Sequence, residues 1–172
     1  MIELRDAGPA DADTVARLHT QSWQSAYRGI LPDAYLDGEL VPEKQAHWRQ
    51  VLSRPPAGAV IILAEGPAGP VGFVAAYPEP DGGALIDNLH VLPGDRRGGT
   101  GRRLMAAVAA RLRDAGVHAA RLTVYEVNTP AVAFYRRVGG NLVGRDVETK
   151  AGVSAPVLEF VWHDLAALAA RA

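Results

Sequence analysis

The sequence predicts an α/β fold in a single domain, with a mixed, mostly antiparallel sheet, a central pair of parallel strands that splay apart, and helices flanking the sheet. Three features of the chain predict this fold. Apolar runs of strand length alternate with longer stretches whose apolar residues recur at helical spacing. In the first half, short turns join three consecutive strands, which makes those strands antiparallel. In the second half, a helix connects two strands, and this crossover makes them parallel.

Length and composition limit the classes of function. At 172 residues the chain has the length of one domain, so we expect residues 1–172 to form a single unit. The net charge of −1 gives no reason to expect binding to nucleic acid. The sequence contains no Cys and its five His are scattered, so neither disulfides nor a metal site are expected. Without a signal-peptide pattern or an apolar run of about 18 residues, a cytoplasmic protein with no membrane partner is expected.

The first half of the chain alternates between the two element types. We expect strands at residues 2–5, 59–65, 71–77 and 85–92, and helices at residues 11–27, from Pro32 to about 36, and from Pro42 to about 52. Asp11 and the two prolines serve as start signals, because acidic residues and proline favour the first turn of a helix. The five-residue Gly/Pro-rich link at 66–70 predicts a β-hairpin.

The second half begins with an Ala-rich helix. We expect helices at residues 104–115, from Thr129 to about 139 and in the tail from 164, and strands at residues 119–125, 142–148 and 157–162. Gly116 suits the left-handed cap of the first helix. Thr129 is expected as the N-cap of the next helix, with Pro130 in its first position. The turn at 150–152 joins the final two strands.

A basic glycine loop, residues 95–103, joins the strand at 85–92 to the helix that follows. Strand, glycine loop and helix together present backbone N–H groups to an anion. Four arginines lie within eight residues of this loop, although a helix N-terminus disfavours positive charge, so a bound anion is expected. A solvated basic loop is the alternative. A Walker loop is excluded because the chain has no Gly-Lys pair, and a dinucleotide loop lacks its third glycine. A ligand crevice is expected where the parallel strands part.

Two motifs resemble the signatures of the GNAT acetyltransferase superfamily. The first is Arg96-x-x-Gly99-x-Gly101 after Leu89-x-Val91-x-Pro93, which resembles that family's coenzyme-A loop. The second is Asn128-x-x-Ala131-x-x-Phe134-Tyr135-x-x-x-Gly139. Together they cover residues from about 85 to 140. The family usually has Phe or Tyr where this chain has Gly140, so we expect weaker packing at that helix end.

The resemblance implies transfer of an acetyl group from acetyl-CoA to an amine by direct attack, without an acyl-enzyme. It implies a coenzyme site formed by Leu89, His90, Val91, Arg96, Arg97, Gly98, Gly99, Thr100, Gly101, Arg102, Asn128 and Tyr135. The strand residues would hold the pantetheine arm, and the loop amides the pyrophosphate. Asn128 would contact the pantetheine region.

The resemblance places Tyr135 near the sulfur, as the acid that assists the leaving thiolate. A tyrosine titrates near ~10 and is therefore protonated at pH 7. The alternative is a core aromatic residue. Asp87 is the first candidate for the base that deprotonates the amine, and a surface Asp bound to a backbone group is the alternative. His90 and Glu126 are weaker candidates, and strict alternation places His90 opposite Asp87 unless a bulge intervenes.

The acceptor is expected to be an amine-bearing small molecule or peptide. Its pocket is assigned to Trp23, Tyr27, Leu31 and Tyr35, with the turn at Lys150 opposite; core packing is the alternative for all four. Asp33, Asp37 and Glu39 are further candidates for attracting a cationic amine. A homodimer stays open, since many family members dimerise. Two other functions stay open: a non-catalytic acyl-CoA-binding module of the same fold, and a nucleotide-phosphate enzyme.

Overall fold

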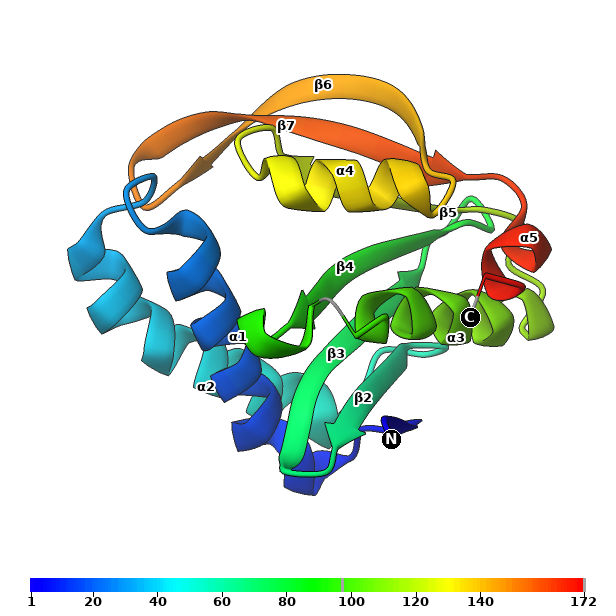
Figure 1. Ribbon diagram of the computed structural model, residues 1–172, viewed down its shortest axis with the longest axis horizontal. Helices are drawn as coiled ribbons and strands as arrows, with labels where there is room; N and C mark the ends of the chain where they lie inside the picture. The colour runs from blue at the N-terminus through cyan, green and yellow to red at the C-terminus, as the bar shows by residue number, and fades with distance from the viewer. Residues whose placement is uncertain (97, 172) are drawn as a thin grey trace.

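A computed structural model describes residues 1–96 and 98–171 (Figure 1). Arg97, predicted to contribute to the pyrophosphate site, lies outside the described residues. The strands are β1 (Glu3–Asp6), β2 (Val60–Gly66), β3 (Gly69–Pro78), β4 (Ala84–Val91), β5 (Ala120–Tyr125), β6 (Asn141–Lys150) and β7 (Val153–Trp162). The helices are α1 (Ala12–Tyr27), α2 (Leu40–Ser53), α3 (Thr100–Asp114), α4 (Thr129–Arg137) and α5 (Leu165–Ala169).

The strands form one mixed sheet in the order β1-β2-β3-β4-β5-β7-β6, which confirms the predicted fold class. In the described chain, β4 and β5 are the parallel neighbours, and they pair at Ala84 with Ala120 and at Leu85 with Arg121. Beyond these two pairs the strands separate (Figure 1). The remaining length of β4 therefore has a backbone edge that β5 does not cover.

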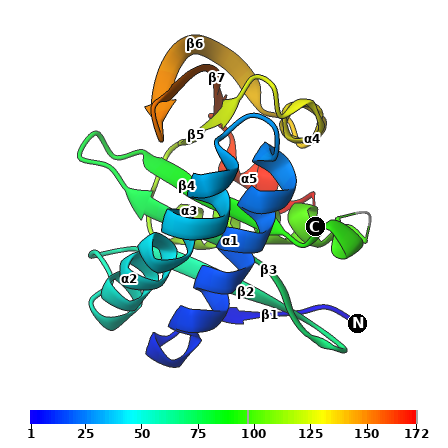
Figure 2. The same ribbon diagram turned by 90° about the vertical axis from the view of Figure 1, so that its left-hand side faces the viewer.

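Helices cover both faces of the sheet. Helices α1 and α2 lie on one face of β2–β4, and α3 lies on the other (Figure 2). Leu18, Trp48 and Phe73 belong to the core under α1 and α2. Leu104 and Leu112 belong to the larger core between the sheet and α3, which α4 and α5 complete. The apolar stripes predicted from helical spacing therefore face the sheet.

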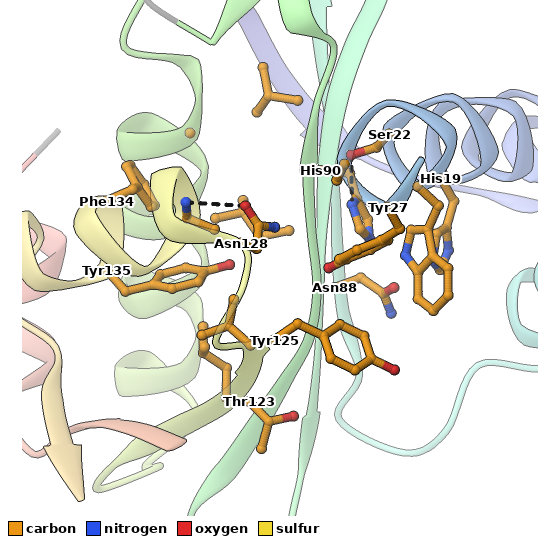
Figure 3. Close-up of a pocket in the computed structure, with 18 of the residues that line it drawn as sticks. His19, Ser22, Tyr27, Asn88, His90, Thr123, Tyr125, Asn128, Phe134 and Tyr135 are labelled. Atoms are coloured by element: carbon orange, nitrogen blue, oxygen red, sulfur yellow. Dashed lines mark hydrogen bonds between the residues drawn. The ribbon is translucent and has the colours of Figure 1, made fainter. Parts of the chain in front are cut away.

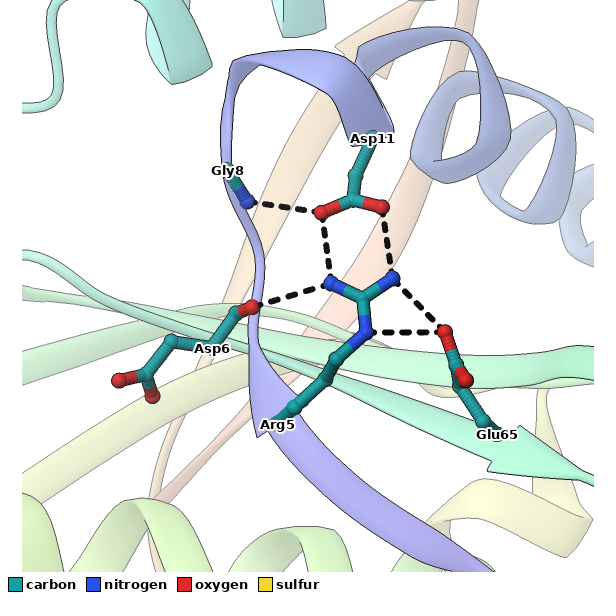
Figure 4. A network of polar contacts seen from close by, with 5 residues as sticks. All are labelled: Arg5, Asp6, Gly8, Asp11 and Glu65. Carbon is teal, nitrogen blue, oxygen red and sulfur yellow. Dashed lines mark hydrogen bonds and ion pairs between the residues drawn. The ribbon is translucent and has the colours of Figure 1, made fainter.

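Arg5 joins three segments near the N-terminus (Figure 4). Its guanidinium donates to both carboxylate oxygens of Asp11 at 2.8 Å, and to Glu65 at 2.7 and 2.9 Å. Asp11 also accepts from the Gly8 amide at 2.8 Å, just before α1. The network fixes the entrance of α1 against β1 and β2. Because the Arg5 side chain is 44% exposed, we expect the ion pairs to orient the start of α1 more than they stabilise the fold.

The region between α1 and α2 differs from the prediction. Helical structure begins at Asp33 and continues through a wide π-helical turn at Tyr35–Glu39 into α2. The Leu40 amide donates to Tyr35 O, five residues earlier. Pro42 therefore lies inside a continuous helical segment instead of opening a new helix. The prediction of two separate helices was wrong because the segment continues past Pro42, which lacks an N–H, just after the wide π-helical turn.

Two turns also differ from the prediction. Gly66 pairs directly with Gly69, so the β2–β3 hairpin has a two-residue loop instead of the five-residue link. Helix α3 begins at Thr100, four residues before the predicted start, because Gly99 at φ +77° turns the chain into the helix. The early start places Gly101 in the first helical turn.

The N-cap of α4 is Asn128, one residue before the predicted Thr129. Its Oδ1 accepts a hydrogen bond from the Ala131 amide at 3.4 Å. Asn, like Thr, satisfies a free amide at a helix start. Because Oδ1 is used for capping, the side-chain amide nitrogen is the group that remains for a ligand.

Gly140 packs tightly, so the predicted weakness at this helix end was wrong. A Cβ at Gly140 would lie 2.7 Å from the Trp162 ring, 3.0 Å from Tyr135 O and 3.1 Å from Phe160. Trp162 is buried, and its indole nitrogen donates to Val138 O at 3.1 Å. Trp162 thus occupies the volume beside this residue, and any side chain at Gly140 would have to displace it.

Candidate functional site

A cavity of about 790 Å³ opens where β4 and β5 separate (Figure 3). Its walls come from α1, α2, β4, the start of α3, β5, α4, the end of β6 and β7. Among the predicted coenzyme residues, Leu89, His90, Val91, Arg96, Gly101, Asn128 and Tyr135 line it. The structure therefore brings residues of both signature motifs to one space, although they lie far apart in the sequence.

The side of the cavity where the predicted coenzyme residues lie combines a free strand edge with a helix N-terminus. Arg96 Nε donates to Val91 O at 3.0 Å, which fixes the loop against the end of β4. Gly101 lies against Phe134: a Cβ at Gly101 would be 3.4 Å from the Phe134 ring. Its neighbour Thr100 is buried. The first turn of α3 has amides without helical acceptors. The Arg103 guanidinium does not line the cavity, and its Nη1 donates to Ile2 O at 2.8 Å.

Tyr135 and Tyr27 face each other across the cavity. Figure 3 shows their hydroxyl groups directed toward the same space, with Asn128 beside them. Both rings are buried. Burial raises the pKa of Tyr135, and the neighbouring Tyr27 raises it further. Burial likewise raises the pKa of Tyr27, with Asn128 acting in the opposite direction. Both phenols are therefore protonated donors at pH 7.

Asp87 lies at a β-bulge in β4. Ala75 of β3 pairs with Asn88 and Ala76 pairs with Ile86, so Asp87 has no partner residue across the ladder. Asp87 is exposed at the cavity, and its Oδ2 accepts from Asn88 Nδ2 at 2.7 Å. A bulge interrupts alternation. Asp87 and His90 line the same cavity, which agrees with the exception to strict alternation that a bulge allows.

His90 packs against α1. Its Nδ1 lies 3.0 Å from Ser22 Oγ, and its ring stacks on His19 at 4.4 Å (Figure 3). Burial lowers the pKa of His90 to about 3, with Lys44 and Arg96 contributing in the same direction. A ring that resists protonation is a weak proton acceptor.

Glu126, the other candidate base, is not among the cavity's lining residues. Its carboxylate pairs with Arg145 at 2.9 Å, and this bond holds the pKa of Glu126 below its usual range. The geometry therefore favours Asp87 among the three candidates.

The predicted acceptor residues divide into two groups. Trp23 and Tyr27 line the cavity. The Tyr27 ring makes edge-to-face contacts with Trp23, at 5.1 Å between ring centroids, and with Tyr125, at 5.2 Å. Leu31 and Tyr35 are buried in the core beneath and do not line the cavity. The candidates for attracting an amine also lie elsewhere: Asp33 and Asp37 pair with Arg28, and Glu39 is exposed outside the cavity lining.

Sequence reasoning did not identify four polar side chains that line the cavity: His19, Lys44, His47 and Glu148. Lys44 and Lys150 both donate to Glu43 Oε1, at 3.0 and 2.8 Å. Lys44 also lies over the Trp23 ring at 4.7 Å. The predicted position of the Lys150 turn opposite the aromatic residues agrees with this arrangement. Neither lysine forms a motif, so the sequence carried no signal for their pairing.

The described residues contain no cluster of three metal-ligating side chains. Across the same residues, each helix is too short or too polar to cross a bilayer.

Comparisons with known proteins agree with this geometry. Residues 15–140 match the "Acetyltransferase (GNAT) family". "Uncharacterized N-acetyltransferase YuaI" of Bacillus subtilis (strain 168) is 31% identical over 98% of this chain and 96% of that protein. "Probable N-acetyltransferase Rv2775" of Mycobacterium tuberculosis is 30% identical over 90% of each chain. The chain therefore belongs to the GNAT acetyltransferase family, and it is an acetyl-CoA-dependent N-acetyltransferase.

Solved structures share the fold. The PaiA N-acetyltransferase of Thermoplasma acidophilum, crystallised with coenzyme A, has a TM-score of 0.77 at 19% identity, over 92% of this chain and 98% of that one. The ribosomal-protein-alanine N-acetyltransferase of Brucella melitensis has a TM-score of 0.72 at 22% identity, over 94% and 99%. These likenesses confirm the predicted architecture, and family membership decides against the nucleotide-phosphate alternative.

Proposed function

We propose that this enzyme transfers the acetyl group of acetyl-CoA to a primary amine by direct attack within a ternary complex. The observation that carries the proposal is the cavity at the separation of β4 and β5, which joins a free strand edge to the first turn of α3. Backbone groups of β4 that lack a strand partner can pair with the amides of pantetheine. The amides from Gly98 to Arg102 suit the pyrophosphate, because a helix N-terminus favours negative charge.

Asp87 acts on the amine in this proposal. Its exposed position at the bulge leaves the carboxylate in contact with water, so it accepts the amine's proton directly or through one water molecule. Asn88 donates to the carboxylate and orients it. The amine nitrogen then forms a bond to the thioester carbonyl carbon, and the bond from that carbon to sulfur breaks.

Tyr135 acts on the departing sulfur. Because burial raises its pKa, the phenol keeps its proton at working pH and donates it in a hydrogen bond as negative charge develops on sulfur. The thiolate, with a pKa near ~8.5, then takes up a proton from solvent, because a phenol whose pKa is raised keeps its own. Tyr27, opposite Tyr135, and the side-chain nitrogen of Asn128 complete a set of donors around the thioester.

The test is thiol release on mixing the enzyme and acetyl-CoA with a panel of primary amines. Amine-dependent release of coenzyme A, together with the N-acetylated product by mass spectrometry, supports transfer. Binding of acetyl-CoA by calorimetry without release on any amine would instead support the non-catalytic acyl-CoA-binding module. The retained Tyr135 and Asn128 on the cavity wall favour the enzyme.

A further inference from the structure

His19 presents a buried donor with no partner. Its side chain is 4% exposed and lies on the cavity wall. Trp48 Nε1 donates to His19 Nδ1 at 3.1 Å. An indole nitrogen can only donate, so Nδ1 is the acceptor and the proton of the neutral ring is on Nε2. Within the described chain, His19 Nε2 has no hydrogen-bond partner. A ligand with an acceptor atom would remove this deficit.

Two ammonium groups lie at the same end of the cavity. Lys44, Lys150 and His19 all line this cavity. Lys44 is buried, and both lysines share one oxygen of Glu43. The other oxygen of Glu43 accepts from Tyr35 at 2.9 Å. One carboxylate thus serves two ammonium groups, and each ammonium has further N–H donors for an incoming acceptor.

Groups of the opposite charge line the same cavity. Asp87 is exposed at the bulge, and Glu148 accepts from Tyr125 at 3.2 Å. A ligand in this space therefore meets carboxylates that suit an ammonium group, and a set of donors that suits an anion. A simple amine would leave the His19 donor unpaired. A carboxylate has two oxygens and can accept from a ring N–H and an ammonium together.

Resting on the acetyltransferase activity proposed above, we propose that the acceptor is a zwitterionic amine of the amino-acid class. Its carboxylate binds His19 Nε2, Lys44 and Lys150, and its amine faces Asp87. Trp23, which lies beneath the Lys44 ammonium, provides an apolar surface for the carbon skeleton. The three donors determine specificity, while Asp87 and Tyr135 carry out the transfer.

The experiment compares matched acceptors by thiol release: amino acids, their carboxamides and the corresponding decarboxylated amines. The structure predicts that kcat/KM for the preferred amino acid exceeds that of its decarboxylated amine and its carboxamide by about tenfold or more, the size of one charge-assisted hydrogen bond. Lys44→Met and Lys150→Met should each reduce this ratio by about the same factor. Arg49→Met is the control, because Arg49 lies on α2, pairs with exposed Asp13 and is outside the cavity lining.

A second readout separates this inference from the proposed activity. Amino acids should raise the Tm of the wild type and of Arg49→Met, and should raise it less in Lys44→Met and Lys150→Met, whether or not thiol is released. Thiol release with equal kcat/KM for amino acids and decarboxylated amines would overturn the zwitterionic acceptor and leave the transfer intact. Absence of thiol release with every amine, together with a lysine-dependent Tm shift, would overturn the transfer and keep the binding site.

Discussion

Substitution of Gly140 tests the packing that holds Tyr135 in place. The added Cβ of Gly140→Ala would lie 2.7 Å from Trp162 and 3.1 Å from Phe160, and both rings are buried. Separations under 3.0 Å require the ring to move. Forcing an extra carbon into a packed core costs about 1–3 kcal/mol. For a chain of this size, that cost lowers Tm by roughly 2–12 °C.

The assay is thermal unfolding by calorimetry, with Gly94→Ala as the control. A Cβ at Gly94 meets nothing within 4 Å, so Tm should stay within about 2 °C of the wild type. Tyr135 contacts Phe160 and Trp162 at 5.9 and 6.0 Å, so we also expect Gly140→Ala to lower kcat. An unchanged or higher Tm for Gly140→Ala would show that this volume is not filled by Trp162, and the reasoning would be wrong.

Four further predictions concern the site. Tyr135→Phe should lower kcat about 100-fold with little change in the affinity for coenzyme A, and an unchanged kcat would remove its role. Asp87→Asn should lower kcat/KM about 100-fold and His90→Gln much less; pH–rate profiles of both variants give the comparison, and the reverse order would transfer the base to His90. Trp48→Phe removes the indole donor to His19 and should reduce the free energy of unfolding, measured by urea titration, by about 1 kcal/mol or more. A variant as stable as the wild type would show that this hydrogen bond does not stabilise the fold. Burial lowers the pKa of His90 to about 3, below its unfolded value. The contribution of His90 to the free energy of unfolding is therefore fully present above pH ~6.5 and is lost as pH decreases toward about 3. His90→Gln should lose less stability over that range, and an equal loss would contradict the buried neutral ring.

The periodicity of the sequence predicted most elements, because their apolar residues follow the spacing of the face they bury. The strands around the site and helix α1 lie close to the expected bounds. The glycine loop between β4 and α3 was also predictable, since proline ends a strand and glycine permits the turns of a loop. Boundaries were less predictable: Gly99 starts α3 early and Asn128 replaces Thr129 as the cap. The loop contains three glycines, and the sequence does not indicate that Gly99 is the one with the positive φ at the start of α3. Asn and Thr both favour the N-cap position, so the cap of α4 was open between them.

The side of the cavity near α1 and α2 was not predictable because distant segments form it. His19 finds its partner Trp48 across the α1–α2 contact, 29 residues away. Lys150 reaches Glu43 from the far end of the chain. The bulge at Asp87 arises from the pairing of β3 with β4, which alternation within one strand cannot reveal. Likewise, nothing adjacent to Gly140 indicated that Trp162 would fill the space beside it.

A crystal structure with acetyl-CoA tests the central claim most directly. We expect the diphosphate oxygens within hydrogen-bond distance of the amides of the first turn of α3. We expect the pantetheine amides to pair with the free edge of β4, and the sulfur to lie beside the Tyr135 hydroxyl. A diphosphate bound elsewhere, with the space between β4 and β5 closed, would contradict it.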